Sequence, residues 1–97
     1  MGKLSFLHEA PLFCGDCVRF VGTDGEENIA CGVTAYAIKY CDPSLPHHGL
    51  LPAEAFVAAF EKLIVEIHNI AKTKYENGKF ETEGPIRVMV HREDIAP

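Results

Sequence analysis

Tryptophan, basic residues and long apolar runs are all scarce in this sequence. None of the 97 residues is tryptophan. No apolar run approaches the roughly 18 residues that a membrane span needs, which excludes a transmembrane helix. Nine Lys and Arg stand against 14 Asp and Glu, giving a net charge of −5 with histidine neutral. Nucleic-acid phosphates are bound by concentrated basic surfaces, so we expect no nucleic-acid partner. Without a long apolar run we also expect no membrane partner.

Internal repeats, low-complexity tracts and linkers are also missing, which predicts a single domain over residues 1–97. The composition, 47% hydrophobic and 24% charged, is typical of a globular domain with one core. The first residues lack the apolar core of a signal peptide, so we expect a cytoplasmic location. In that reducing compartment the four cysteines are expected to be thiols or metal ligands rather than disulfides.

Apolar and polar side chains alternate in four segments, a pattern that predicts half-buried strands. They are residues 3–7, 17–21, 28–33 and 85–90. A glycine-rich turn containing Asp24 and Gly25 separates the second segment from the third, and Asp-Gly tolerates the positive φ that tight hairpins require. These two segments are therefore predicted to form an antiparallel hairpin.

Two helices are predicted after the hairpin. Thr34 stands where a helix N-cap would, directly before a short helix over residues 35–41. The strongest helical signal spans residues 52–77, with a proline in its first turn and Asn77-Gly78 as a left-handed stop. The large apolar side chains of this segment share one arc roughly 120° wide. They are Phe56, Phe60, Leu63, Ile64, Ile67, Ile70 and Ala71.

The predicted fold is α+β. A small, mainly antiparallel sheet, made of the hairpin and the terminal strands, packs on one long amphipathic helix, and a second, short helix completes the domain. Val65 is the one large apolar residue of the long helix outside its apolar arc. About 25 helical residues span about 38 Å, which exceeds the width of a compact domain of this size. The helix must bend, or one end must project and be covered, and since a second subunit is the obvious cover we expect a homodimer.

Short runs along most of the chain form a recognisable pattern. They are Val18-Arg19-Phe20, Ile29-Ala30-Cys31-Gly32-Val33-Thr34, Ala55-Phe56, Phe60-Glu61, Glu66-Ile67, Ile70-Ala71, Tyr75-Glu76-Asn77-Gly78 and Ile86-Arg87-Val88. In these runs the sequence resembles the bacterial family known as "domain of unknown function 1488". The resemblance implies a small bacterial α+β protein, and it implies no catalytic residue because the family has no assigned activity. Members tend to carry a tryptophan before the second strand, where this chain has Leu12-Phe13.

Cys14-x-x-Cys17 is the motif most suggestive of chemistry, and it is not part of the family pattern. A structural zinc site needs two further ligands, usually a second closely spaced pair. Cys31 and Cys41 are too far apart in sequence for that, and Cys31 alternates onto an apolar strand face. The alternative metal site is looser: Cys14, Cys17, Cys41 and His47, or the histidine next to it. A redox pair is less favoured, because the motif precedes a strand rather than the helix start that lowers a thiol pKa.

The remaining polar residues have ordinary interpretations. His47 and His48 lie in a loop that contains proline and glycine, where a solvated pair is the common finding. His68 borders the apolar arc of the long helix, where a histidine more often packs its ring than does chemistry. The sequence has no phosphate-binding glycine loop and no nucleophile elbow. We therefore assign no catalytic and no cofactor-binding residue, and we expect the protein not to be an enzyme.

Together these observations predict a non-enzymatic cytoplasmic domain that works by contact with an unknown protein partner and with a second copy of itself. The reason is an apolar helix and sheet without a convergent polar site. The alternative is a metal- or thiol-dependent protein that uses Cys14 and Cys17.

Overall fold

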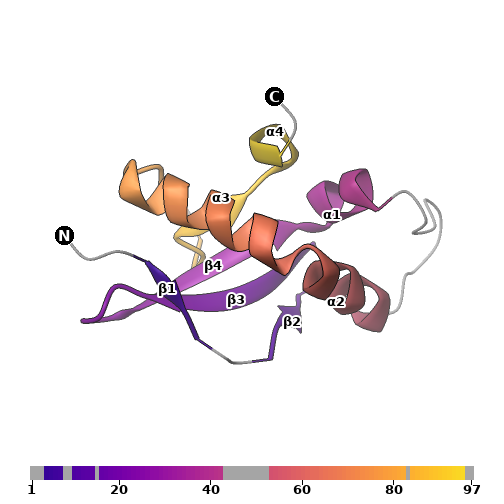
Figure 1. The fold of residues 1–97 in the computed structure, drawn as a ribbon, viewed down its shortest axis with the longest axis horizontal. Coiled ribbons are helices and arrows are strands. Elements are labelled where there is room, and N and C mark those ends of the chain that lie inside the picture. Colours follow the sequence, from indigo (N-terminus) through magenta and orange to yellow (C-terminus); the bar gives the residue numbers. More distant parts are fainter. Residues whose placement is uncertain (1–3, 8–9, 15, 43–52, 83, 96–97) are drawn as a thin grey trace.

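The structure is a computed structural model that describes residues 4–7, 10–14, 16–42, 53–82 and 84–95. Its strands are β1 (Ser5–Phe6), β2 (Leu12–Phe13), β3 (Cys17–Thr23), β4 (Asn28–Thr34) and β5 (Val88–Val90). Its helices are α1 (Ala35–Cys41), α2 (Ala53–Lys62), α3 (Ile64–Glu76) and α4 (Arg92–Ile95). The helices lie against one sheet (Figure 1), which confirms the predicted α+β fold.

β3 and β4 form the centre of the sheet as an antiparallel hairpin, as predicted. All seven residues of each strand are paired, starting from Cys17 opposite Thr34. Gly25 has a φ of 96°, the positive value that favours glycine in this turn. The Asp24 carboxylate accepts hydrogen bonds from the two backbone amides that follow Gly25, at 2.8 and 2.9 Å. The turn is therefore closed by its own side chain, as Asx turns are.

Short strands border the hairpin on both edges. β1 and β2 both pair antiparallel with β3, near its two ends, and β5 pairs parallel with β4. The sheet is thus mainly antiparallel, as predicted, with one parallel pair. A parallel neighbour needs a crossover connection, which α1, α2 and α3 supply between β4 and β5. The last predicted strand is confirmed but is shorter than residues 85–90, since only Val88–Val90 pair with β4.

α1 begins and ends at the predicted residues. The Thr34 hydroxyl oxygen accepts a hydrogen bond from the backbone N–H of Ala37 at 3.0 Å, so the last residue of β4 is also the helix cap. At the other end, the backbone N–H of Asp42 donates to the Ile38 carbonyl at 2.9 Å. Because Thr34 ends β4 and caps α1, the strand passes into the helix without an intervening loop.

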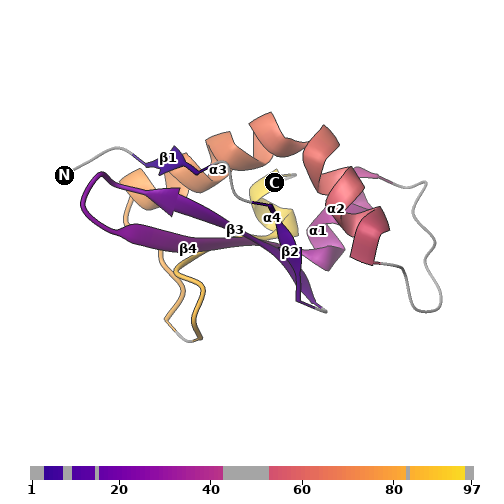
Figure 2. The same cartoon turned by 90° about the horizontal axis from the view of Figure 1, so that it is seen from below.

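The prediction of a single helix over residues 52–77 is wrong, because the segment forms two helices, α2 and α3, that meet at Leu63. Leu63 has a φ of −103° and a ψ of 8°, and its N–H is shared between the carbonyls of Ala59 and Phe60. A straight helix of about 38 Å would overrun seven-residue strands of about 23 Å. The change of direction keeps both apolar halves on the sheet (Figure 2). The argument for a dimer from helix length therefore no longer applies.

The C-terminal end of α3 is confirmed as a glycine stop. Gly78 has a φ of 70°. The backbone amides of Gly78 and Lys79 donate to the carbonyls of Tyr75 and Lys74, at 3.1 and 2.9 Å. The other predicted boundary, residue 52, lies outside the described residues.

The core lies between one face of the sheet and the apolar arc of α2 and α3. Its buried members include Val18, Phe20, Ile29, Cys31, Val33, Phe56, Phe60, Ile67, Ala71, Val88 and Val90. Leu63, Ile64 and Ile70, the other members of the predicted arc, are partly buried against this core. Val65, predicted to lie outside the arc, is 71% exposed. The predicted apolar arc is therefore confirmed.

α4 has no counterpart among the predicted elements. Its sequence is mostly polar, and its first turn is closed by Asp94, whose carboxylate accepts a hydrogen bond from the backbone N–H of His91 at 2.8 Å. The helix lies near α1, with which it makes contact (Figure 1). Within the described ranges, no helix combines the length and the apolar character that a membrane crossing needs.

Candidate functional site

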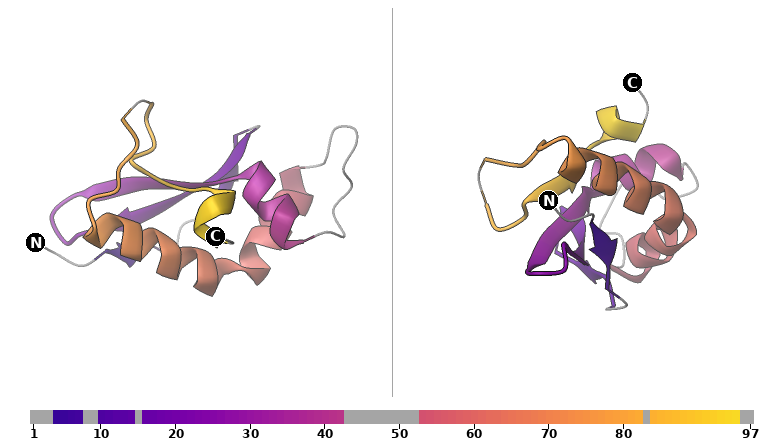
Figure 3. Two further views of the ribbon diagram at one scale, coloured as in Figure 1. Left: turned by 90° about the horizontal axis from the view of Figure 1, so that it is seen from above. Right: turned by 60° about the vertical axis from the view of Figure 1, so that its left-hand side comes forward.

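The two faces of the sheet are covered unequally. α2 and α3 lie over one face (Figures 2 and 3). The segment between α3 and β5, described at residues 79–82 and 84–87, lies beside the other face. Strand alternation places the following side chains on this second face, here called the outer face: Leu12, Cys17, Arg19, Val21, Ala30, Gly32 and Met89. Leu12 is 61% exposed, and most of the others are half-buried.

Gly32 lets the chain before β5 approach the outer face closely. A Cβ at position 32 would lie only 3.1 Å from Cδ1 of Ile86, so a larger residue would push that side chain away. The backbone N–H of Arg87 donates to the Ala30 carbonyl at 2.9 Å and fixes this part of the chain along β4. The end of the outer face around Val21 instead borders an open cavity of about 250 Å³.

Cys14 and Cys17 lie together at one end of the outer face. The backbone N–H of Cys14 donates to the Cys17 carbonyl at 2.9 Å, and both residues line a cavity of about 270 Å³ that also includes Arg19 and Met89. Cys14 is exposed, whereas Cys17 is 3% exposed. Burial first, and then the neighbouring Asp16 carboxylate and Cys14, raise the pKa of Cys17 to about 11. The Cys17 thiol is therefore protonated at neutral pH.

The structure does not bring Cys41 to this pair. Cys41 is the last residue of α1, and burial raises its pKa. Within the part of the chain that is described, no three His, Cys, Asp or Glu side chains are grouped as ligands for a metal ion. His47 and His48 lie outside the described residues. Of the predicted metal-ligand set, the structure therefore assembles the pair Cys14 and Cys17.

Cys31 and His68 are used for packing, as the sequence pattern indicates. Cys31 is fully buried in β4, and burial raises its pKa to about 11. The His68 ring stacks on Phe6 with centroids 3.9 Å apart, and Phe20 and Phe60 flank it. Burial lowers the pKa of His68, which favours the neutral ring.

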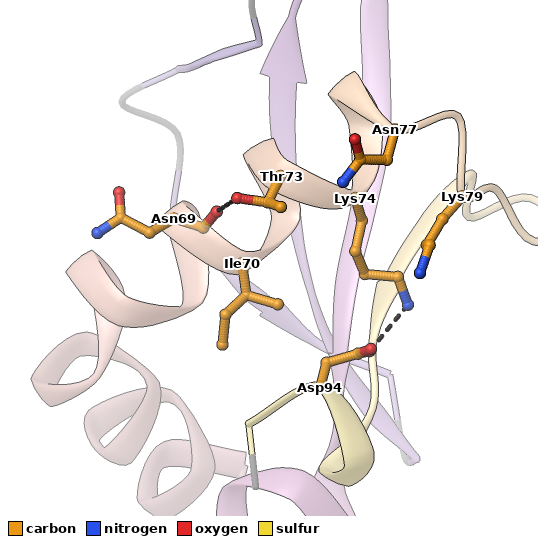
Figure 4. A pocket seen from close by; sticks show the side chains of 7 residues that line it. All are labelled: Asn69, Ile70, Thr73, Lys74, Asn77, Lys79 and Asp94. Carbon is orange, nitrogen blue, oxygen red and sulfur yellow. Dashed lines mark hydrogen bonds and ion pairs between the residues drawn. The ribbon is translucent and has the colours of Figure 1, made fainter. Parts of the chain in front are cut away.

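A cavity on the helical side of the domain was not predicted from the sequence. Lys74 of α3 donates to the Met89 carbonyl of β5 at 2.7 Å and pairs with Asp94 of α4 at 2.8 Å (Figure 4). The pair borders a cavity of about 310 Å³, which Lys79 also lines. The partners of Lys74 lie 15 and 20 residues away in sequence, so no local spacing could reveal the contact. Lys74 therefore clamps α3 to β5 and to α4, and the Asp94 carboxylate neutralises its ammonium group.

Tyr75 joins the end of α3 to the turn between β3 and β4, a second contact that the sequence did not reveal. Its hydroxyl donates to the Asp24 carboxylate at 3.0 Å. Backbone amides, and then this hydrogen bond, lower the pKa of Asp24, while the bond to Asp24 raises the pKa of Tyr75. The Phe80 ring lies 5.6 Å from the Tyr75 ring beside the same turn. Both titratable groups are therefore occupied in holding the helix to the hairpin.

A comparison with protein families places the sequence. The family described as "Protein of unknown function (DUF1488)" matches residues 14–88. The chain belongs to the DUF1488 family. The match confirms the resemblance seen in the sequence, and its description assigns no activity. No curated protein matches this DUF1488 sequence.

A crystal structure of a DUF1488-family protein of unknown function from Shewanella loihica PV-4 is similar to this structure. The two chains share 16% sequence identity with a TM-score of 0.66, over 89% of this chain and 97% of that one. At this identity the similarity concerns the fold alone. The α+β arrangement described here is therefore also found in a member of the DUF1488 family whose sequence has diverged widely.

Proposed function

We propose that this DUF1488 domain is a bacterial cytoplasmic protein without catalytic activity that works by protein contact. The outer face is the contact surface, and a second copy of the chain is its occupant. One observation carries the proposal: the helices bury one face of the sheet, while the outer face presents exposed and half-buried apolar side chains.

The outer face has the chemistry of an interface. The Leu12 side chain is 61% exposed, and Val21, Ala30 and Met89 are half-buried on the same face. Contiguous apolar surface of this kind marks protein contact sites. Residues before β5 cover the outer face around Gly32, so the part left open for a second copy is the end that Leu12, Val21 and Ala30 line.

The charges at the outer face favour a second copy as the occupant. Arg19 lines the same cavity as the acidic residues Asp16 and Glu81, so both signs of charge are present. In a two-fold interface the same patch meets itself, and Arg19 of one copy can face a carboxylate of the other. A partner of one strong charge would leave one of these two signs unmatched.

The proposal that the domain is not an enzyme rests on where its perturbed titratable groups lie. Their pKa values are displaced by burial or by hydrogen bonds that hold the fold together. Catalytic acids and bases converge on one cavity. In the part of the chain that the structure describes, the groups are instead distributed over the outer face, the core, the end of α1 and both sides of α3, namely Cys17, Asp24, Cys31, Cys41, His68, Tyr75 and Asp94.

The bacterial and cytoplasmic parts of the proposal have separate support. The structural neighbour comes from Shewanella loihica, a bacterium. All four cysteines of this chain are free thiols in the structure, which is the state that a reducing compartment maintains.

Size-exclusion chromatography with light scattering, from micromolar to millimolar protein, tests the self-association. We expect the unchanged chain to approach twice its 10.7 kDa mass as concentration rises. Leu12→Glu places a charge at the most exposed apolar side chain of the proposed contact and is expected to give the monomer. Val65→Glu is the matched control, because Val65 is 71% exposed but lies on α3, and it should leave the dimer intact.

Two outcomes would contradict the proposed contact. If the unchanged chain remains at 10.7 kDa at every concentration, it does not self-associate. If Val65→Glu dissociates the dimer and Leu12→Glu does not, the copies meet through their helices and the outer face is not the interface.

A further inference from the structure

We infer that Cys14 and Cys17 form a thiol–disulfide site: a reversible disulfide bond closes across the β2–β3 hairpin by exchange with a small-molecule disulfide. Both sulfur atoms belong to one chain, so the reaction needs no second copy and can be followed in the monomer even if the proposed self-association fails.

The register of the hairpin places the two cysteines opposite each other. Leu12 pairs with Arg19, and Phe13 pairs with Val18. The next step along both strands pairs Cys14 with Cys17, and the hydrogen bond of 2.9 Å between Cys14 N–H and the Cys17 carbonyl continues the ladder. The motif is therefore a cross-strand pair and not two loop residues that happen to be close in sequence.

Cross-strand pairing brings the backbone within the range of a disulfide. Residues directly opposite each other at a hydrogen-bonded position of an antiparallel pair have Cα atoms about 5.5 Å apart. Disulfides form at Cα separations of about 4.4–6.8 Å. Opposed side chains also project to the same face of the sheet, and Cys14 and Cys17 line the same cavity. Opposed Cβ atoms lie about 4.5–5.5 Å apart, with the wider spacing at hydrogen-bonded positions, whereas a disulfide holds them at about 3.5–4.5 Å. Closure therefore requires a small local shift at the end of the hairpin as well as side-chain rotation, and the strain of the closed bond makes it easier to reduce.

Unequal burial gives the two thiols different parts in the reaction. Cys14 is exposed and can meet a dissolved disulfide, whereas Cys17 is 3% exposed and is screened from it. The Cys14 thiolate attacks one sulfur of the reagent, RSSR, and a mixed disulfide forms as the first RS⁻ leaves. The Cys17 thiolate then attacks the Cys14 sulfur and releases the second RS⁻. The two protein thiols are oxidised, the reagent is reduced, and the two protons that the cysteines lose convert both RS⁻ ions to RSH.

The burial of Cys17 also predicts which step is slow. Its raised pKa, about 11, leaves little thiolate at neutral pH. Because the thiolate is the nucleophile, closure should accelerate about tenfold for each unit by which the pH rises towards that pKa. A disulfide that closes so short a loop removes little chain entropy, so it contributes little stability and stays open to reduction. The arrangement suits a reversible site better than a structural bridge.

Peptide mapping of the intact chain can test this inference directly. Trypsin cleaves after Lys3, Arg19, Lys39 and Lys62, so Cys14 and Cys17 share one peptide, while Cys31 and Cys41 each lie in another. After treatment with oxidised glutathione, unfolding and alkylation, we expect the 4–19 peptide to be unalkylated and two hydrogens lighter. Dithiothreitol should reverse the change, and the peptides with Cys31 and Cys41 should be alkylated throughout.

Two variants separate the steps. Cys17→Ser should stop at the glutathione adduct on Cys14, and Cys14→Ser should abolish the reaction at the hairpin. Leu12→Glu, which breaks the proposed dimer contact, should close the bond at least as fast as the unchanged chain, because Cys14 is exposed in the single chain. The inference is overturned if the 4–19 peptide stays doubly alkylated or carries the adduct alone at about pH 9, where the Cys17 thiolate is more abundant.

Discussion

The imidazole ring of His68 lies flat against the phenyl ring of Phe6, with ring centroids 3.9 Å apart and planes inclined by 8°. The rings of Phe20 and Phe60 lie 5.4 and 6.3 Å from the same imidazole. This surrounding of aromatic rings joins β1 to α3 and favours the neutral form of the histidine, since burial lowers its pKa. A histidine on the border of an apolar arc therefore packs like a fourth aromatic residue.

The first prediction is that His68 makes the stability of the domain depend on pH. Because its pKa is lower in the folded chain than in the unfolded one, the unfolded chain binds more protons as pH falls below about 6.5. The free energy of unfolding should therefore decrease from about pH 7.5 to about pH 5.5. His68→Phe keeps the stacked ring and should reduce that decrease in urea titrations at both pH values. An unchanged pH dependence in the variant would show that other groups cause it.

The second prediction concerns the core beneath the sheet. Phe60 is 1% exposed, and its ring lies 5.2 Å from that of Phe20. Phe60→Ala should lower the free energy of unfolding by about 3–5 kcal/mol, because it leaves a cavity between α2 and the sheet. Since a whole domain is stable by only about 5–15 kcal/mol, this variant should be partly unfolded at room temperature.

Val65→Ala is the control for the core prediction. It shortens a side chain on α3 that is 71% exposed, so it should change the free energy of unfolding by less than about 0.5 kcal/mol. Urea denaturation followed by circular dichroism measures both variants. Equal effects of the two substitutions would contradict the assignment of Phe60 to the core.

The third prediction is that Thr34 sets the start of α1. Its hydroxyl oxygen is the acceptor for the Ala37 backbone N–H, which otherwise has no partner within the helix. Thr34→Ala should cost about 0.5–2 kcal/mol of stability, and Thr34→Ser, which retains the acceptor, should cost less. A larger loss for serine than for alanine would show that the methyl group matters more than the cap.

The elements that could be predicted from the sequence are those specified by neighbouring residues. The alternation of the two hairpin strands, the Asp24-Gly25 turn, the Thr34 cap and the Gly78 stop are local signals, and each is confirmed. Of the first predicted strand, residues 3–7, the structure shows Ser5–Phe6 as β1. The break at Leu63 has no local signal, because no proline or glycine marks it and the length of the sheet imposes it. A local sequence pattern thus predicts only those features of the fold that neighbouring residues determine.

The candidate site follows the same rule. The spacing of Cys14 and Cys17 marks the pair in the sequence, but β2 is only two residues long and shows no alternation that would predict its pairing with β3. Without knowledge of that pairing, the sequence predicts a loop at the motif, followed by a strand. A motif that precedes a strand rather than a helix disfavours a redox role. The opposed arrangement on the outer face emerges only when the register is known. Contacts such as Lys74 with Asp94 depend likewise on tertiary placement.

The last prediction is that Asp94 contributes stability at neutral pH that is lost in acid. Burial alone would raise the pKa of its carboxyl group, but hydrogen bonds from the Lys74 ammonium group and the His91 backbone N–H, both 2.8 Å long, lower it below its ordinary value. The contribution is therefore present above the unfolded-state pKa of about 3.9 and disappears as pH falls through the lower folded-state value. Asp94→Asn removes the charge and leaves the Lys74 ammonium group, whose side chain is 12% exposed, without its counter-ion.

Asp94→Asn should accordingly cost about 1–3 kcal/mol near neutral pH, and the difference from the unchanged chain should shrink towards about pH 3. Glu27→Gln is the matched control, because Glu27 also pairs with a basic residue, Arg87, at 3.1 Å, but both side chains are at least half exposed. Solvent screens that pair, so its loss should cost no more than about 1 kcal/mol. Urea denaturation across this pH range measures both variants. If the two substitutions cost the same, or if the effect of Asp94→Asn persists in acid, then Lys74 does not clamp α3 to α4 through this ion pair.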